Sequence, residues 1–125
     1  MTKNFFNNKS FKIFKKGEKY IPGLVQTFAK NPFQFSFGFS PIFLNKGKGC
    51  YVSDINGNKL IDTIMGIGPL ILGYNNKIIN KAIKSQINKG IIFSLTNPQE
   101  VELAEILNRE TKFDMFKFSK TGADV

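Results

Sequence analysis

Apolar residues recur along this chain at two spacings, one typical of helices and one typical of strands. Near the N-terminus, Phe11 and Phe14 recur at helical spacing among lysines. This pattern predicts a short amphipathic helix over residues 10–20. Ser10 is expected to cap its N-terminus, and the helix must end before Pro22 because proline and the following glycine interrupt the pattern.

Two further helices are expected in the second half of the chain. Apolar residues at positions 78, 79, 82, 83 and 87 form one stripe, and Gly90 can end that helix in a left-handed cap. The next helix has a stronger start signal, with Asn97 as N-cap, Pro98 at the first helical position and Glu100 placed to reach back to the cap. Its buried face is expected to comprise Leu103, Ala104, Ile106 and Leu107.

Residues 41–64 have the shorter period of strands. Three apolar runs are separated by two turns, with strands expected at 42–44, 50–52 and 60–61 and turns at 45–49 and 54–58. Asn56 and Gly57 suit the positive backbone angles of a tight hairpin turn. The pattern predicts a small antiparallel meander, one face of which must be covered, because three short strands with both faces in water are unstable.

The segments on either side of these elements are less regular. The phenylalanine-rich residues 24–40 have no clear period and are expected to form an extended, looping segment. Residues 115–118 read as a strand that runs into a Ser/Thr/Gly turn at 119–125. Such a turn is normally followed by a helix whose free N–H groups can bind phosphate, so we expect the chain to be a truncated part of a larger protein.

Composition excludes several classes of site. The 125 residues include 42% apolar residues and 14 phenylalanines, which is enough for a packed core. With one cysteine, Cys50, and no histidine, no internal disulfide can form, and the usual zinc sites and histidine-assisted nucleophiles are excluded. The longest uncharged apolar stretch, residues 63–74, is shorter than the roughly 20 residues of a membrane span. Without a secretory signal pattern either, a cytoplasmic location is expected.

The formal charge of +9 raises the question of a nucleic-acid partner. Six lysines and one glutamate fall in the first twenty residues, but the later lysines are scattered. This distribution favours a solvated surface, with no nucleic-acid and no membrane partner. The alternative is that the chain is a small basic binding module without catalytic activity.

A set of ordered segments is more informative than any of them alone. They are residues 20–23 (YIPG) with 26–28 (QTF), 47–62, 68–74 (GPLILGY), 96–105 and 118–125. In this order they resemble the N-terminal part of a class III, fold-type I pyridoxal-phosphate (PLP) aminotransferase, close to the glutamate-1-semialdehyde 2,1-aminomutases. The resemblance implies an α/β fold with an α+β N-terminal segment. Residues 1–9 would be a flexible N-terminus, 10–76 a helix and a small-domain meander, and 77–125 the start of the large PLP domain.

The resemblance also implies a cofactor site. In the family, PLP is bound by a lysine far downstream and paired with an aspartate, so no catalytic residue is assigned here and the fragment alone is expected to be inactive. Thr121, Gly122 and Ala123 occupy the position of the family's Ser-Gly-Ser/Thr turn, where backbone N–H groups and a hydroxyl hold the cofactor phosphate. Ala123 stands where the family usually has a hydroxyl residue, which puts one hydrogen bond in question.

Three residues align with positions that hold the substrate in aminomutases. Thr27 matches a hydroxyl residue, Lys30 matches an arginine, and Ile67 matches an aromatic residue. Lysine cannot form the bidentate carboxylate clamp of arginine, so a glutamate-1-semialdehyde-like substrate and a keto sugar both remain open. Asp54 and Asp62 are expected to be turn and strand-end residues.

The resemblance implies a homodimer with active sites at the subunit interface. Apolar side chains of residues 28–43 are the expected surface that the partner subunit covers.

Overall fold

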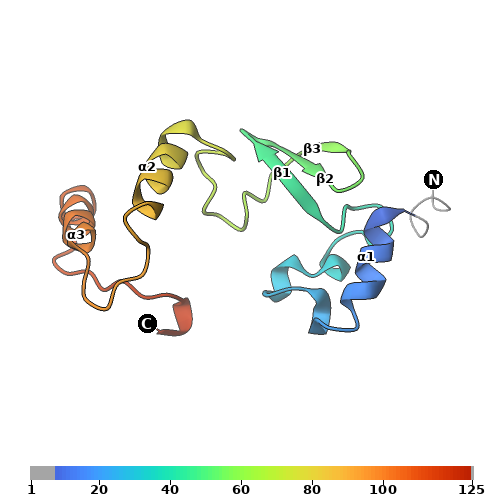
Figure 1. The fold of residues 1–125 in the computed structure, drawn as a ribbon, viewed down its shortest axis with the longest axis horizontal. Helices are drawn as coiled ribbons and strands as arrows, with labels where there is room; N and C mark the ends of the chain where they lie inside the picture. Colours follow the sequence, from blue (N-terminus) through green and yellow to red (C-terminus); the bar gives the residue numbers. More distant parts are fainter. Residues whose placement is uncertain (1–7, 125) are drawn as a thin grey trace. The chain divides into compact units, whose positions relative to one another are not determined.

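The computed structural model describes residues 8–124, which form two compact units that divide between Lys81 and Ala82 (Figure 1). The first unit contains helix α1, three short 3-10 turns (η2 to η4) and strands β1 to β3, and helix α2 crosses the division. The second unit contains helix α3 and a last 3-10 turn, η5. The helices are α1 (Lys9–Gly17), α2 (Lys77–Ile87) and α3 (Pro98–Thr111). The 3-10 turns are η2 (Pro22–Leu24), η3 (Phe28–Lys30), η4 (Pro32–Gln34) and η5 (Gly122–Asp124).

Helix α1 starts earlier and ends earlier than the sequence predicts. The N-cap is Asn8, whose side chain accepts a hydrogen bond from the Phe11 N–H, so the assignment of Ser10 as the cap was wrong. Ser10 instead lies in the first turn and is only 1% exposed. Its N–H donates to Asn56 Oδ1 at 3.4 Å, which attaches α1 to the hairpin turn of the sheet. Most of the expected flexible N-terminus, residues 1–7, lies outside the described residues.

The phenylalanine-rich segment is not extended but coils into 3-10 turns against α1. The Phe14 ring, the most buried apolar side chain described, lies 6.0 Å from the Phe33 ring and 5.3 Å from the Phe37 ring between centroids. Asn31 begins η4 by accepting the Phe33 N–H, and Pro32 supplies the fixed backbone angle of the first position. These local caps explain turns that apolar periodicity does not reveal.

The antiparallel meander is confirmed, with strand order β1-β2-β3. Its strands are β1 (Leu44–Lys48), β2 (Tyr51–Asp54) and β3 (Lys59–Ile61). The predicted turn at residues 45–49 was wrong, because these residues are mostly β1, which contains an irregularity between Leu44 and Lys46. The chain reverses instead between Lys48 and Tyr51, where Gly49 has a φ of +58° that glycine adopts without strain.

The second hairpin turn is organised by a buried carboxylate. Asp54, 5% exposed, accepts hydrogen bonds from the Asn56 and Asn58 N–H groups and from Asn58 Nδ2 at 2.8–2.9 Å. Burial raises the pKa of Asp54, but the hydrogen bonds from Asn58 and Asn56 outweigh it, so the pKa lies below its ordinary value. Gly57 has a φ of +94°, as the predicted tight turn requires.

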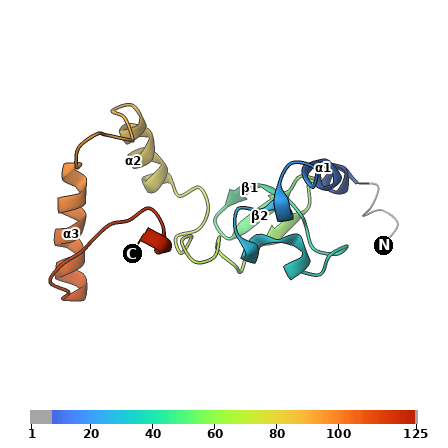
Figure 2. The same ribbon diagram turned by 90° about the horizontal axis from the view of Figure 1, so that it is seen from below.

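Helices α2 and α3 lie where their patterns predict them, but their apolar faces are not covered. Gly90, three residues beyond the end of α2, has a φ of +103°, and Asn97 caps α3 by accepting the Gln99 N–H. Neither helix contains a buried residue, and Leu103 and Ile106 are 45% and 46% exposed. The expectation of a buried face on α3 is therefore not met within the described residues. Figure 2 shows α3 as one straight helix.

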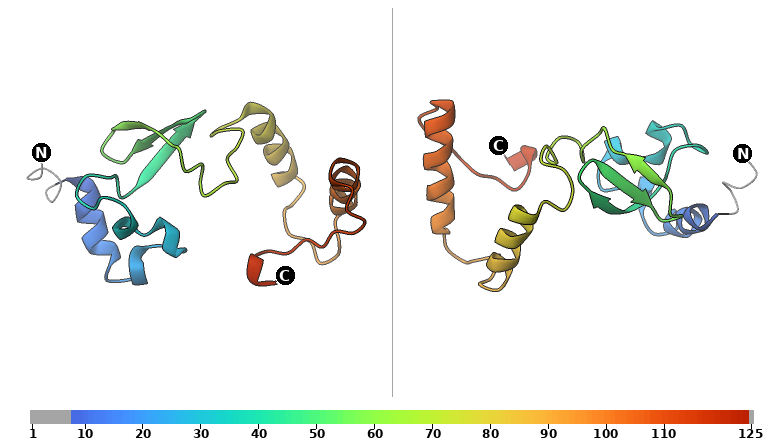
Figure 3. Two further views of the ribbon diagram at one scale, coloured as in Figure 1. Left: turned by 180° about the vertical axis from the view of Figure 1, so that it is seen from behind. Right: turned by 90° about the horizontal axis from the view of Figure 1, so that it is seen from above.

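The predicted strand at residues 115–118 was also wrong. The segment after α3 runs as an irregular coil to η5, as both views of Figure 3 show. A strand exists only by pairing, and no strand in the described part of this unit offers an edge. None of the described helices is both long and apolar enough to cross a membrane.

Candidate active site

The first unit contains a cavity of about 480 Å³ that is lined by both the 3-10 turns and the sheet. We call it the Lys30–Ile67 pocket. Its size falls within the range of small-molecule sites. Most of its lining is apolar, and the lining residues are Ala29, Lys30, Pro32, Phe35, Ser40, Pro41, Ile42, Leu44, Val52, Leu60, Ile61, Asp62, Thr63, Ile64, Gly66, Ile67 and Tyr74.

The structure brings together two of the three residues aligned with substrate-binding positions. Lys30, at the end of η3, and Ile67, in the loop after β3, line the same pocket although they are far apart in sequence. Thr27 immediately precedes η3, is exposed and is not among the lining residues. The pocket therefore combines the Lys30 cation with an apolar wall, and Thr27 is not part of that wall.

The wall that carries Ile67 has an unusual backbone. Ile67 has a φ of +69° and Met65 a φ of +53°, which are left-handed angles that a β-branched residue such as isoleucine rarely adopts. The start of this loop is held by Asp62, whose Oδ1 accepts the N–H groups of Ile64 at 2.9 Å and Met65 at 3.2 Å. The strained loop is thus anchored to the end of β3.

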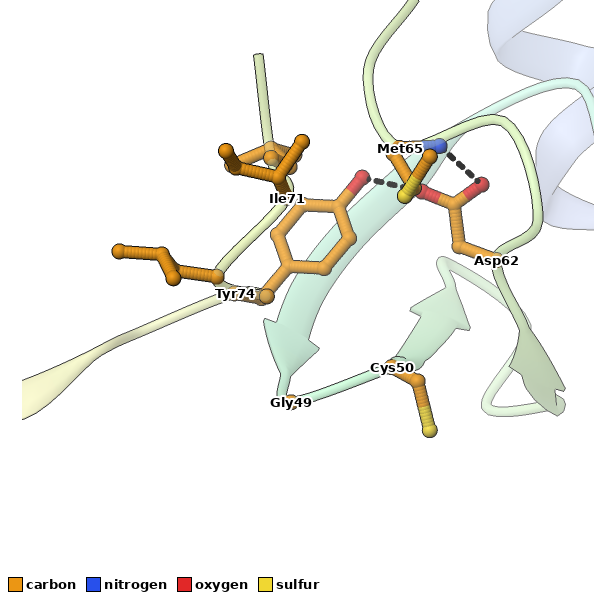
Figure 4. Close-up of a pocket in the computed structure, with 9 residues that line it drawn as sticks. Gly49, Cys50, Asp62, Met65, Ile71 and Tyr74 are labelled. Carbon is orange, nitrogen blue, oxygen red and sulfur yellow. Dashed lines mark hydrogen bonds between the residues drawn. The ribbon is translucent and has the colours of Figure 1, made fainter. Parts of the chain in front are cut away.

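Asp62 is also bound from the other side. The Tyr74 hydroxyl donates to Asp62 Oδ2 at 2.6 Å, and Figure 4 shows the two side chains meeting at the wall of a second, smaller cavity. This cavity, the Tyr74 pocket, measures about 310 Å³ and is lined by Gly49, Cys50, Asp62, Met65, Leu70, Ile71, Leu72, Gly73 and Tyr74. Asp62 and Tyr74 therefore form part of the wall of both cavities.

The hydrogen bond between Tyr74 and Asp62 shifts the pKa of both side chains. Donation by the Tyr74 hydroxyl, which outweighs the burial of the carboxylate, holds the pKa of Asp62 below its ordinary value, and the loop amides add to this effect. The same bond, with burial and the negative charge of Asp62, raises the pKa of Tyr74 to about 12. The pair is therefore a carboxylate and a neutral phenol at neutral pH.

Tyr74 is positioned by two glycines of the first hairpin. Its backbone exchanges two hydrogen bonds with Gly49, at 2.8 and 2.9 Å. Its ring lies directly on Gly47, where an added Cβ would come within 2.4 Å of the ring atoms Cγ and Cδ1. Only glycine at position 47 leaves room for this ring.

The predicted cofactor turn lies in the second unit, where Thr121 immediately precedes η5 and Gly122 and Ala123 lie within it. The Thr121 N–H and the Thr121 hydroxyl both donate to Asp124 Oδ2, each at 2.9 Å. An anionic oxygen is thus already held by an amide and a hydroxyl of the predicted turn, which is the donor chemistry that a phosphate oxygen requires. A side chain added at Gly122 would meet nothing within 4 Å, so the turn is open there. The backbone of Ala123 completes η5.

The sequence predicted Lys30 and Ile67 as substrate-binding residues but did not predict the pair formed by Asp62 and Tyr74. Asp62 was interpreted as a strand-end residue, and no site role was predicted for Tyr74. The two are twelve residues apart, and their contact depends on the bridge between Gly49 and Tyr74, which no local pattern reveals. A tyrosine that follows a glycine-rich loop is the only signal available in the sequence.

Comparison with known proteins shows which family the chain resembles. The family model of the class III aminotransferases matches residues 35–125. The chain is 37% identical over 119 residues to the glutamate-1-semialdehyde 2,1-aminomutase of Hydrogenobaculum sp., covering 94% of this chain and 27% of the relative. It is 36% identical over 118 residues to the 3-aminobutyryl-CoA aminotransferase of Cloacimonas acidaminovorans, covering 93% and 28%. The chain thus spans about a quarter of the length of these relatives.

Solved structures agree with the sequence matches. A transaminase with PLP bound superposes with a TM-score of 0.73 at 26% identity, over 90% of this chain and 24% of that structure. Its fold is the fold-type I PLP-transferase fold, and the helix and antiparallel meander of the first unit are consistent with the N-terminal part of that fold. PLP is thus the cofactor found in the family. On the match of most of its length to the family model, this chain belongs to the class III aminotransferases.

Proposed function

We propose that the chain supplies the N-terminal part of a PLP-dependent aminotransferase or aminomutase, which moves an amino group to or within a keto or aldehyde substrate. The observation that carries this proposal is that Lys30 and Ile67, aligned with substrate-binding positions, line one cavity. When bound, PLP supplies an electron sink for the carbon that loses a proton. The part of the pocket described above would bind and orient the substrate and exclude water from its apolar side.

For the cofactor, we propose that Thr121, Gly122 and Ala123 hold the phosphate. The support is that the Thr121 N–H and hydroxyl converge on a single carboxylate oxygen of Asp124. A phosphate would replace that carboxylate and use the same two donors, together with backbone N–H groups of the turn. Ala123 can contribute its N–H but no hydroxyl.

The assembly belongs to the same proposal. We propose that the complete enzyme is a cytoplasmic homodimer, that its partners are a small amino or keto substrate and a second copy of the chain, and that residues 77–125 begin the large PLP domain. The exposed phenylalanines of residues 28–43 are the surface that we assign to the subunit contact. The 125 residues alone contain no residue assigned to hold PLP covalently, so we expect no turnover from them.

Two measurements test the proposal. The first measures amino transfer by the complete product of the gene. It is monitored through the change in cofactor absorbance when an amino donor is added. PLP-dependent turnover is expected, and a product that binds no PLP contradicts the assignment. The second measures phosphate binding by titration of the 125-residue chain with inorganic phosphate. It is monitored through NMR shifts at residues 121–124. Thr121→Val should weaken this binding, whereas Thr111→Val, which changes a threonine hydroxyl at the end of α3, should not.

A further inference from the structure

The positive charge of the chain is concentrated in its first unit. Residues 8–81 contain eleven lysines and three acidic residues, whereas residues 82–124 contain six basic and six acidic residues. The expectation of no nucleic-acid partner rested on the scatter of lysines along the sequence, but the division into units separates these charges. The excess of positive charge in the described residues therefore belongs to the unit that contains α1 and the sheet.

The three acidic side chains of this unit are engaged in local contacts. Glu18 forms an ion pair with Lys15 at 2.9 Å. Asp54 and Asp62 accept the amide and hydroxyl hydrogen bonds described above. Among residues 8–81, no other lysine forms an ion pair with any of them.

Three of the lysines form a row on α1. Lys9, Lys12 and Lys16 are three and four residues apart, so their side chains project from one face of the helix over a length of about 10 Å. All three are exposed. The opposite face of α1 is packed against the unit through Ser10 and Phe14, which are 1% and 2% exposed. The α1 lysine row is therefore in place before any ligand binds.

An exposed aromatic ring follows the α1 lysine row. Tyr20 is 76% exposed, and its N–H donates to the Gly17 carbonyl at 2.9 Å, which holds it just beyond the end of α1. Clustered lysines bind phosphates, and an exposed ring offers a base a surface for stacking. A membrane surface fits less well, because the Phe14 face that could enter lipid is buried inside the unit. An acidic peptide would use the lysines but not the stacking surface.

We propose that the α1 lysine row and Tyr20 form a binding surface for single-stranded nucleic acid. The lysines contact successive phosphates and one base stacks on the Tyr20 ring, so binding has no sequence preference. None of these four residues lines either cavity. The surface does not depend on the proposed function, so loss of nucleic-acid binding and loss of turnover are separate outcomes.

The salt dependence of binding tests this surface. A fluorescent oligouridylate of about ten nucleotides, a length within the range of single-strand sites, is titrated with the 125-residue chain at several salt concentrations. Fluorescence anisotropy gives the binding constant. Three phosphate contacts predict a slope of about −2 for the logarithm of the binding constant against the logarithm of the salt concentration. In Lys12→Gln/Lys16→Gln one contact remains, so the slope should fall to about −0.7.

Two further comparisons separate the row from net charge and the ring from the row. Lys84→Gln/Lys89→Gln is the matched control, because it removes the same charge from exposed lysines of the second unit and should leave the slope unchanged. Tyr20→Ser should weaken binding about tenfold at an unchanged slope, since one stacked base contributes this much. Tyr20→Phe keeps the ring and should retain the binding.

Three results would overturn the proposal. Equal loss of slope in both double-lysine variants would show that binding follows net charge and not the α1 lysine row. Polyglutamate or phosphatidylserine vesicles that compete as well as unlabelled oligouridylate, at equal negative charge, would make an acidic protein or a membrane the partner instead. A wild-type chain that gives no salt-dependent change in anisotropy would exclude the surface whether or not any variant folds.

Discussion

The Tyr74 hydroxyl donates a 2.6 Å hydrogen bond to Asp62 Oδ2, and this contact joins the loop that carries Ile67 to the first hairpin of the sheet. Asp62 uses its other oxygen to hold the amides of Ile64 and Met65. Tyr74 is in turn fixed by its two backbone bonds to Gly49. The left-handed angles of Met65 and Ile67 persist because the loop is bound at both ends.

Removal of the hydroxyl alone should loosen this loop. Tyr74→Phe keeps the ring on Gly47 but leaves Asp62 Oδ2 without its donor. We expect a loss of about 1 kcal/mol in the free energy of unfolding, measured by urea denaturation, since a partly exposed hydrogen bond to a charged group contributes this much. Amide hydrogen exchange of residues 64–67 should accelerate. Tyr20→Phe changes an exposed tyrosine outside the site and should affect neither quantity.

The same pair predicts how stability depends on pH. The folded pKa of Asp62 is lowered, so its contribution is present above the ordinary aspartate pKa of 3.8 and is lost as pH falls through the folded value. The folded pKa of Tyr74 is raised to about 12, so its contribution is complete below the unfolded value of 10.0 and is lost as pH rises toward 12. Ultraviolet titration of tyrosinate should contain a step near pH 12 that Tyr74→Phe removes. A wild-type curve without that step would contradict the hydrogen bond.

A methyl group at position 47 should displace the Tyr74 ring. In Gly47→Ala the new Cβ would lie 2.4 Å from two ring atoms, so the ring must move and its hydroxyl must leave Asp62. We expect a loss of about 1–3 kcal/mol, typical of overpacking. A double-mutant cycle supplies the control: in a Tyr74→Ala background the same substitution should cost little, because the ring is absent. Additive costs would show that the clash is not with Tyr74.

The local elements of the fold follow closely from the sequence. The turn at Asn56 and Gly57, the cap at Asn97 and the positive φ of Gly90 after α2 are each specified by residues within a few positions of one another. The strand predicted at residues 115–118 fails for the opposite reason, because a strand needs a partner edge and the described residues of the second unit contain none.

The candidate site, like the fold, could be predicted from the sequence only in part. Lys30 and Ile67 were predicted as substrate-binding residues through resemblance to a family, and both line one cavity. The pair of Asp62 and Tyr74 could not be found, because its geometry depends on a bridge between the first hairpin and the end of the loop. Asp62 and Tyr74 support the wall of the pocket but belong to no sequence motif. Only the backbone pairing of the folded chain reveals their contact.

The buried carboxylate of the second hairpin should matter more than an exposed one. Asp54→Ala leaves the Asn56 and Asn58 N–H groups without their acceptor, and we expect a loss of about 2 kcal/mol in the free energy of unfolding. Asp114→Ala, in the coil after α3, is the control and should cost little. Because the pKa of Asp54 is lowered, its contribution should also disappear as pH falls below the ordinary value of 3.8. An Asp54→Ala variant as stable as the wild type at neutral pH would contradict this role.

The proposed subunit contact can be tested on the phenylalanine segment without altering the pocket. Phe28 and Phe39 are 73% and 75% exposed and are not among the pocket-lining residues. If a second copy covers them, Phe28→Ser/Phe39→Ser should lower self-association, because about 0.8 kcal/mol is lost for each CH₂ group that is no longer buried. Sedimentation at several concentrations measures the shift. Tyr20→Ser is the control, since it removes an aromatic of equal exposure, 76%, from outside the segment. Equal association of the double variant and the wild type would place the subunit contact elsewhere.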